Sequence, residues 1–388
     1  LESVTDENGV IQPKSGWTKI FIYPGEGIFR DVTKDTCVLV GSTKQVSDDI
    51  DIITSMDNIP DIDADALTAA LSRNLTNSFA TIIPGIEGKT MPRATLVNSL
   101  GDGWRELNID MIEAISFVQS ELAASPKLIQ MDSYDIPVKR GGAANNGGSD
   151  LLFFDSNATL FNSYNGHINL GSGMRNARID TVDIHGGDSK FLDSSINPTT
   201  IVDSVLNDYV TLPVNTGRQT RNAKTVQEWK RILERESRGA FPGNTVLIPR
   251  AIRTKGSAYF SRERVFVSTN FVVCNMPNIE QAVLLSSWMT TIFYQLVCEV
   301  SSKDEVGMRK MEVKDILTTL VPNFDTLSAD LFSRIQANLA DTSFLELKTP
   351  TIRNIDRIWA EELFGVNADD KLDEATRLLA FLANRRDV

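Results

Sequence analysis

Residues 241–322 carry the pattern that decides the fold of this 388-residue chain. They begin with the turn Phe241-Pro242-Gly243 and the apolar run from Thr245 to Pro249 (TVLIP), which is typical of a buried strand. A second strand is predicted over Val265 to Val273, because β-branched and aromatic residues fill it and Asn275-Met276-Pro277-Asn278 ends it. The stretch therefore predicts two buried strands that lead into a helical region.

The pattern becomes helical from Gln281 to Val300, where apolar side chains recur at helical spacing. Several Ser and Thr residues interrupt this apolar run, so it is interpreted as a core helix and not as a membrane span. The segment Gly307-Met308-Arg309-Lys310 predicts a turn, and Leu320-Val321-Pro322 closes the region.

The order of these segments resembles the target-recognition region of bacterial restriction–modification proteins, namely the DNA adenine-N6 methyltransferases and the methyltransferase–endonuclease fusions built on them. The matching segments are Leu247-Ile248-Pro249-Arg250, Val267-Ser268-Thr269-Asn270-Phe271, Ala282 to Leu296 and Gly307 to Pro322. The stretch from Val138 through Arg140-Gly141 to Phe153-Phe154 resembles the opening of the same recognition domain. The resemblance implies an α+β fold, with a mixed β-rich recognition domain and a helical C-terminal tail, preceded by a short α/β-like remnant.

Four regions are expected along the chain. Residues 1–45 are predicted to form strand, turn and strand, which the resemblance interprets as the end of a methyltransferase-like core. Residues 46–135 are predicted to form an acidic loop and a helical connector, residues 136–322 the DNA target-recognition domain, and residues 323–388 a helical tail. Within the recognition domain, the many Asn, Ser, Gly and Asp residues between 155 and 210 predict irregular β structure.

Basic residues are concentrated between Arg218 and Arg264. This segment holds 12 Lys and Arg against 4 Glu, a local charge of +8, in a chain of formal net charge −12. Such segregation is typical of contact with backbone phosphates, although a solvated helix face could explain part of it. The predicted phosphate contacts, including two from the later turn, are Arg218, Arg221, Lys224, Arg250, Arg253, Lys255, Arg309 and Lys310.

The resemblance implies that double-stranded DNA is the partner and that side chains beside the predicted strands read base edges. Arginine suits guanine and asparagine suits adenine, because each forms two hydrogen bonds with that base in the major groove. The candidate base contacts are Lys139, Arg140, Asn145, Asn146 and Asn270.

The motifs that an adenine-N6 methyltransferase needs are missing from this sequence. It contains neither a glycine-rich loop for the methyl donor nor an Asn/Asp-Pro-Pro-Tyr/Phe motif, which would hold the flipped base. No catalytic residue, cofactor or metal site is therefore assigned, and S-adenosylmethionine is expected only in a methyltransferase catalytic domain or subunit that acts as a partner. Because the chain begins at Leu1, we expect it to be a piece of a longer protein.

A different class of function remains open from sequence alone. The acidic balance, the polar middle and the absent catalytic motifs would also suit a structural or assembly protein, such as a viral coat or scaffold, with no DNA-reading role. A hydrolase has no support beyond scattered acidic residues. Three cysteines without metal-ligand spacing favour buried thiols in a reducing cytoplasm, and no membrane partner is expected.

Overall fold

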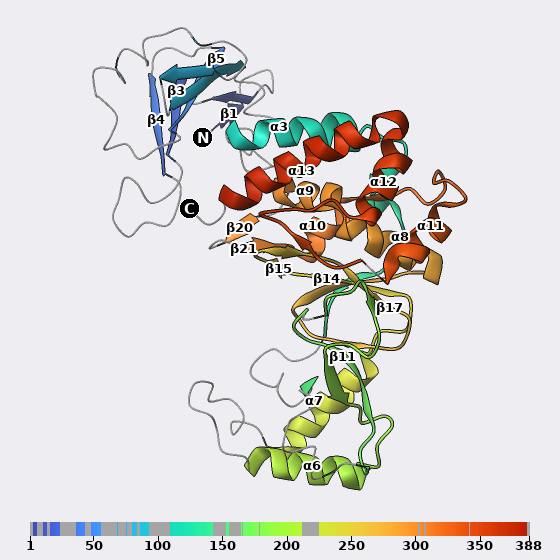
Figure 1. The fold of residues 1–388 in the computed structure, drawn as a ribbon. Helices are drawn as coiled ribbons and strands as arrows, with labels where there is room; N and C mark the ends of the chain where they lie inside the picture. Colours follow the sequence, from blue (N-terminus) through green and yellow to red (C-terminus); the bar gives the residue numbers. More distant parts are fainter. Residues whose placement is uncertain are drawn as a thin grey trace. The chain divides into compact units, whose positions relative to one another are not determined.

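The computed structural model divides the chain into two compact units, residues 1–116 (unit 1) and residues 117–387 (unit 2), each described by itself (Figure 1). The described residues are 3–5, 11–13, 16–23, 36–42, 48–55, 68, 75, 80–83, 86–92, 109–142, 153–154, 164, 166–177, 179–211, 225–301, 303–305, 308–340 and 342–385.

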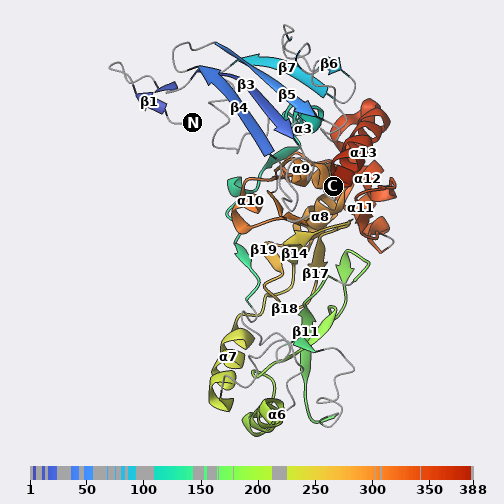
Figure 2. The same cartoon turned by 90° about the vertical axis from the view of Figure 1, so that its left-hand side faces the viewer.

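Unit 1 contains a five-stranded sheet in the order β4-β3-β5-β7-β6 (Figure 2). The pair β3–β5 is parallel and the other neighbours are antiparallel. The unit also holds a short hairpin, β1–β2, and most of helix α3. The bounds are β1 Ser3–Thr5, β2 Ile11–Pro13, β3 Gly16–Tyr23, β4 Thr36–Ser42, β5 Asp49–Ser55, β6 Ala80–Ile83, β7 Ile86–Pro92 and α3 Ile109–Phe117.

The start of the predicted acidic loop is instead strand β5, so the sheet runs across the boundary expected at residue 45. The reason is an alternation of acidic and apolar side chains. Asp49 is exposed and Asp51 is half-buried, whereas Ile50 and Ile52 are buried. A period of two is the signature of a half-buried strand, and the acidic composition hides it. Asp51 is further held by Lys19 of the neighbouring strand, at 2.6 Å.

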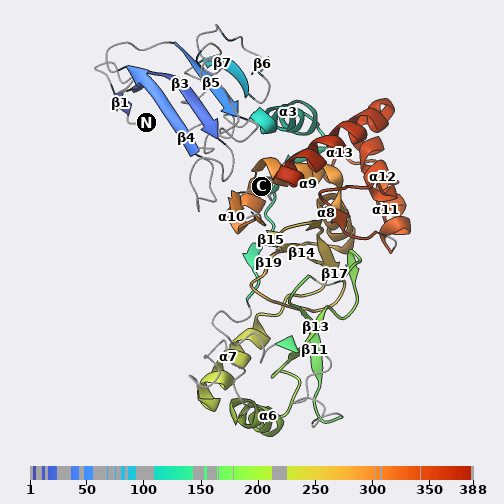
Figure 3. The same cartoon turned by 60° about the vertical axis from the view of Figure 1, so that its left-hand side comes forward.

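The centre of unit 2 is a second five-stranded sheet in the order β12-β17-β14-β19-β9, which includes both strands predicted from residues 245–273. Strands β14 and β19 pair antiparallel along their whole length, and β9 forms an edge. Helix α8 packs against β14 and β17 (Figure 3). The bounds are β9 Val138–Arg140, β12 Asp183–Ile184, β14 Thr245–Pro249, β17 Tyr259–Ser261 and β19 Phe271–Asn275.

At one end of unit 2, helices α6 and α7 pack on a four-stranded sheet in the order β10-β13-β11-β18 (Figure 1). Its core includes Trp229 of α7 and the stacked rings of Phe191 and Phe266, whose centroids lie 3.8 Å apart. The prediction of irregular β structure over 155–210 was therefore wrong for α6, whose apolar residues recur at helical spacing. The bounds are β10 Phe153–Phe154, β11 Leu170–Met174, β13 Ser189–Leu192, β18 Phe266–Val267, α6 Thr199–Thr211 and α7 Val226–Arg238.

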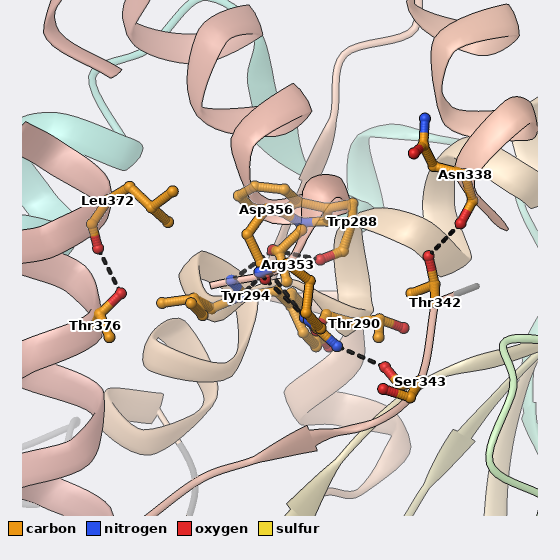
Figure 4. A network of polar contacts seen from close by, with 12 residues as sticks. Trp288, Thr290, Tyr294, Asn338, Thr342, Ser343, Arg353, Asp356, Leu372 and Thr376 are labelled. Carbon is orange, nitrogen blue, oxygen red and sulfur yellow. Dashed lines mark hydrogen bonds and ion pairs between the residues drawn. The ribbon is translucent and has the colours of Figure 1, made fainter. Parts of the chain in front are cut away.

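The helix predicted over 281–300 is two helices, α8 (Ile279–Thr290) and α9 (Ile292–Ser301), bent by 67° at Thr291. Such a break exposes backbone groups that need partners. The N-terminus of α12 provides them: the Asp356 carboxylate accepts from the Ile292 N–H at 3.0 Å, and Arg353 donates to the Thr290 carbonyl at 2.7 Å (Figure 4). A contact distant in sequence thus ends the helix, which the local pattern could not reveal.

Helices form the other end of unit 2, and the predicted helical tail is present there (Figures 1 and 3). Gly365 ends α12 with a positive φ of 55°, as its position in the sequence suggests. Together with the mixed sheets, this tail confirms the α+β fold class. The remaining bounds are β8 Leu128–Gln130, β15 Ala251–Ile252, β16 Lys255–Gly256, β20 Lys303–Glu305, β21 Met308–Lys310, α10 Val313–Leu317, β22 Leu320–Pro322, α11 Leu331–Leu339, β23 Leu345–Glu346, α12 Asn354–Phe364 and α13 Ala368–Arg385.

Among the described residues, no single helix is both long and apolar enough to cross a membrane, and only the bent pair α8 and α9 reaches that length and composition jointly. Cys274 and Cys298 are buried free thiols. Burial raises the pKa of the Cys274 thiol to about 12, so it stays protonated.

The buried carboxylate of Asp193 links the end of β13 to the rest of unit 2. It accepts hydrogen bonds from the Ser195 N–H at 2.9 Å and from the Arg264 guanidinium. Burial alone would raise the pKa of Asp193, but the bonds from Ser195 and Arg264 outweigh it and hold the pKa below its ordinary value.

We expect Asp193 to make unit 2 sensitive to acid. A depressed pKa contributes stability above the unfolded-state pKa, near 4, and this stability is lost as the pH falls through the folded pKa. Thermal unfolding of the Asp193→Asn variant should therefore depend less on pH below about 4 than that of the wild type. Asp330→Asn, at an exposed carboxylate, is the control. Equal pH dependence in all three proteins would contradict the assignment.

Candidate nucleic-acid interface

The edge strand β9 and the loop Ser268-Thr269-Asn270 form one polar surface of unit 2. Arg140 of β9 donates through Nε to the Thr269 carbonyl at 3.4 Å, and Arg250, after β14, donates to the same oxygen at 3.0 Å. Arg140 and Asn270 are both exposed. The fold thus gathers at one loop three predicted site residues that lie up to 130 positions apart in the sequence.

The loop is held by contacts with the segment after β11. Ser268 Oγ and Asn270 Nδ2 each donate to the Arg175 carbonyl, both at 2.9 Å. The Asp188 carboxylate in turn accepts from the backbone N–H groups of Arg175 and Asn176, at 2.6 and 2.7 Å. This network fixes the direction of the loop, which a surface that reads bases needs.

Gly141 brings β9 close to the same loop. Its N–H donates to the Phe271 carbonyl at 3.0 Å. A Cβ atom at Gly141 would lie 2.0 Å from the Ser268 carbonyl oxygen, so no other residue fits without moving the backbone. The Arg140-Gly141 pair noted in the sequence therefore has a structural reason: the glycine allows the approach that places the arginine beside Thr269.

The predicted base contacts lie as follows. Lys139 and Arg140 are neighbours on β9 and point to opposite faces of the sheet, since side chains alternate along a strand. Asn270 is at the loop tip. Asn145 and Asn146 lie outside the described residues.

Several predicted phosphate contacts are already engaged within the protein. Arg250 is mostly buried and is paired with Glu312, and Lys255 is paired with Glu346 at 3.5 Å and lies over the Phe344 ring. Arg253 is exposed and Lys310 is half-buried in β21. Arg218, Arg221 and Lys224 lie outside the described residues.

The prediction that Arg309 contacts phosphate is wrong in this structure. Its side chain is fully buried, paired with Glu299 at 3.0 Å and bonded to the carbonyl and side chain of Gln295. The turn expected at 307–310 is instead strand β21 from Met308 to Lys310, and the strand directs Arg309 inward. A lone arginine in sequence carries no sign of such a buried partner.

The local charge of the basic segment is largely compensated in three dimensions. Six of its cations form ion pairs, most of them with carboxylates outside the segment; the pairs are Lys230–Asp203, Arg235–Glu236, Arg250–Glu312, Lys255–Glu346, Arg262–Asp183 and Arg264–Asp193. Charge counted along the sequence therefore overstates the charge of the surface. Among the described residues, Arg238, exposed at the end of α7, has no ion-pair partner, and it was not among the predicted contacts.

Metal ligands do not gather in the described ranges. No group of three or more His, Cys, Asp or Glu side chains there could hold a metal ion. His185 is exposed and lies 3.8 Å from Asp183, and His167 is exposed as well.

Comparison with known proteins identifies the family of most of unit 2. A family model described as the specificity domain of the restriction endonuclease BpuSI matches residues 139–352. The solved structure of the type IIG restriction endonuclease BpuSI is similar to this chain with a TM-score of 0.66 and 30% sequence identity. The similarity covers 96% of this chain and 44% of the endonuclease, so the chain spans less than half of that protein.

A short match involves a different class of protein. A 25-residue segment is 72% identical to S-adenosylmethionine:tRNA ribosyltransferase-isomerase of Acetivibrio thermocellus and 76% identical to that of Caldanaerobacter subterraneus subsp. tengcongensis. The segment is 6% of this chain and 7% of each of these curated relatives, which is too little to define a domain.

Proposed function

Because this chain belongs to the family of the BpuSI specificity domain, we propose that it reads the sequence of double-stranded DNA as the recognition part of a restriction–modification protein. The family match covers residues 139–352, which is 214 of 388 residues. The resemblance to restriction–modification target-recognition regions noted in the sequence is thereby confirmed. The match favours this function over a structural or assembly protein.

The assignment of a base-reading surface rests on one observation: Arg140 and Asn270 lie at the same exposed loop. Among the described residues, Arg140 is hydrogen-bonded only through Nε, at 3.4 Å, which leaves both terminal nitrogens to donate to guanine O6 and N7. Asn270 uses one N–H toward Arg175 and keeps its second N–H and its carbonyl oxygen, the pair that adenine requires. We assign base reading to these two residues.

Other predicted contacts have different roles under this proposal. Arg250 orients the loop, because its guanidinium is mostly buried between Glu312 and the Thr269 carbonyl. Arg253, Lys255 and Lys310 remain candidates for phosphate contact at the rim, where exposed side chains can exchange an internal partner for a phosphate at low cost.

Chemistry on the DNA is assigned to another part of the assembly. The sequence has no methyl-donor loop and no Asn/Asp-Pro-Pro-Tyr/Phe motif, so S-adenosylmethionine would bind in a methyltransferase catalytic domain or subunit. Residues 1–45 remain our candidate for the end of such a catalytic core, now together with β5, β6 and β7 of the same sheet. The buried free thiols Cys274 and Cys298 suit the reducing cytoplasm, where we place the protein.

The test is selection from a pool of random duplex DNA by the 388-residue chain, followed by sequencing of the retained fraction. The wild type is expected to enrich one motif, and Arg140→Ala should relax the preference at one guanine position by about 1–3 kcal/mol. Asn270→Ala should do the same at one adenine position. Lys314→Ala, at an exposed lysine of α10, is the control with an unchanged motif. Retention without any enriched motif would refute sequence reading.

A further inference from the structure

A cleft of about 350 Å³ lies where the end of α7 meets the edge of the central sheet. Its lining includes Lys139 of β9, Asn275 of β19, Arg238 at the end of α7, and the apolar side chains of Pro137, Phe241 and Pro242. We propose that this cleft binds one backbone phosphate of duplex DNA between Lys139 and Arg238. This inference rests on the proposed function. It assigns Lys139 a phosphate contact in place of the base contact predicted from the sequence.

The charges around the cleft support an anionic ligand. Both Lys139 and Arg238 are exposed, and neither forms an ion pair with a described residue. Nearby cations differ: Arg235 is paired with Glu236 at 2.7 Å, and Arg264 with Asp193. No carboxylate is among the lining residues. Lys139 and Arg238 therefore make the electrostatic potential in the cleft more positive than the ion-paired cations around it do.

The neutral part of the lining suits a phosphate oxygen. Asn275 lies on the same face of the sheet as Lys139, because Lys139 is opposite Val273 and side chains alternate along a strand. The Thr245 hydroxyl donates to the Pro242 carbonyl at 2.6 Å, and its 3.4 Å contact with Asn275 Oδ1 does not engage the amide NH₂ of Asn275. That NH₂ group is a donor for a bound phosphate.

The end of a helix normally repels an anion, because its last carbonyl groups carry partial negative charge. At α7 the carbonyls of Arg235, Glu236 and Ser237 already have donors. The Gly239 N–H donates to the carbonyls of Arg235 and Glu236, and Arg264 donates to the Ser237 carbonyl at 2.7 Å. The positive charge of Arg238 adds to this compensation. The helix end therefore does not oppose phosphate binding in the cleft.

The salt dependence of DNA affinity tests the proposal. Each neutralised phosphate contributes about 0.9 to the slope of log affinity against log salt concentration. We expect Lys139→Gln and Arg238→Gln each to lower this slope, and the double variant to lower it by about 0.9 in total, because both residues bind the same phosphate. A loss of about 1.8 in the double variant would indicate two separate phosphates and would overturn the single-phosphate site.

Two controls separate this inference from the proposed function. Arg357→Gln removes one exposed positive charge on α12 and should leave the slope unchanged. The enriched motif should stay the same in the cleft variants, since a phosphate contact reads no base. If the wild type shows no salt-sensitive DNA affinity, both the proposed function and the phosphate site are refuted. If the wild type binds normally and the slopes of the variants are unchanged, only the phosphate site is refuted.

Asn275→Asp gives an independent test, because it keeps the shape of the side chain and changes its charge. The new carboxylate would face the phosphate, so DNA affinity at 0.1 M salt should fall by about tenfold or more. Inorganic phosphate at millimolar concentration should not displace DNA from the wild type, because the site binds a phosphate of a duplex backbone. Unchanged affinity of Asn275→Asp, with a native circular dichroism spectrum, would contradict the proposal.

Discussion

Replacing Asp356 with alanine is expected to destabilise unit 2 by about 3–5 kcal/mol, since it breaks a buried ion pair and uncovers a helix end. The Asp356 carboxylate is fully buried and accepts from Arg353 Nε at 2.9 Å and from the Ile292 N–H at 3.0 Å. Its loss would leave Arg353, whose side chain is only 15% exposed, without this counter-charge, and the first N–H of α9 without this partner. Urea unfolding followed by tryptophan fluorescence measures the effect.

The matched control is Asp369→Ala, which removes a carboxylate from an exposed ion pair with Arg357 at 3.3 Å. Exposed pairs contribute little, so its effect should stay below about 1 kcal/mol. Asp356→Asn, which keeps the shape and one acceptor oxygen, should fall between the two. Equal midpoints for Asp356→Ala and Asp369→Ala would show that the bend between α8 and α9 does not depend on this cap.

The bend also marks the limit of what the sequence predicts about the fold. Both central strands and the helical tail follow from local patterns, because alternation and helical spacing are properties of neighbouring residues. The break at Thr291 depends on Arg353 and Asp356, more than 60 residues later, so no local pattern contains it. Strand β5 was not predicted for another reason. Its alternation of acidic and apolar residues is present in the sequence, but the acidic composition of the segment favoured a loop.

For the site, the sequence predicted the region but not which of its cations are engaged within the protein. The segments that resemble target-recognition regions include Arg140 and Asn270, which the fold brings to one loop. The predicted phosphate contacts also included Arg250 and Arg309, whose partners Glu312 and Glu299 come from other elements. The charge of the segment gave no reason to prefer Arg238, because its lack of an ion-pair partner among the described residues is a property of the folded chain.

Replacing Glu299 with alanine is expected to destabilise unit 2 by about 3–5 kcal/mol, because Arg309 would remain as an uncompensated buried charge. Arg309 is fully buried, and among the described residues its Nε has no hydrogen-bond partner, so the pair with Glu299 and the bonds to Gln295 are its main stabilising contacts there. The same urea titration measures the loss. A cost below about 1 kcal/mol would mean that water reaches the guanidinium and that the pair is not buried in solution.

The double variant Glu299→Leu with Arg309→Met separates a structural role of Arg309 from the phosphate contact first predicted for it. An apolar pair of similar volume often replaces a buried ion pair without loss, so the double variant should recover most of the stability that Glu299→Ala loses. Its DNA affinity and salt slope should equal those of the wild type, since Arg309 has no exposed surface with which to reach a phosphate. A slope lower by about 0.9 in the stable double variant would restore Arg309 to the phosphate contacts and would require this part of unit 2 to open when DNA binds.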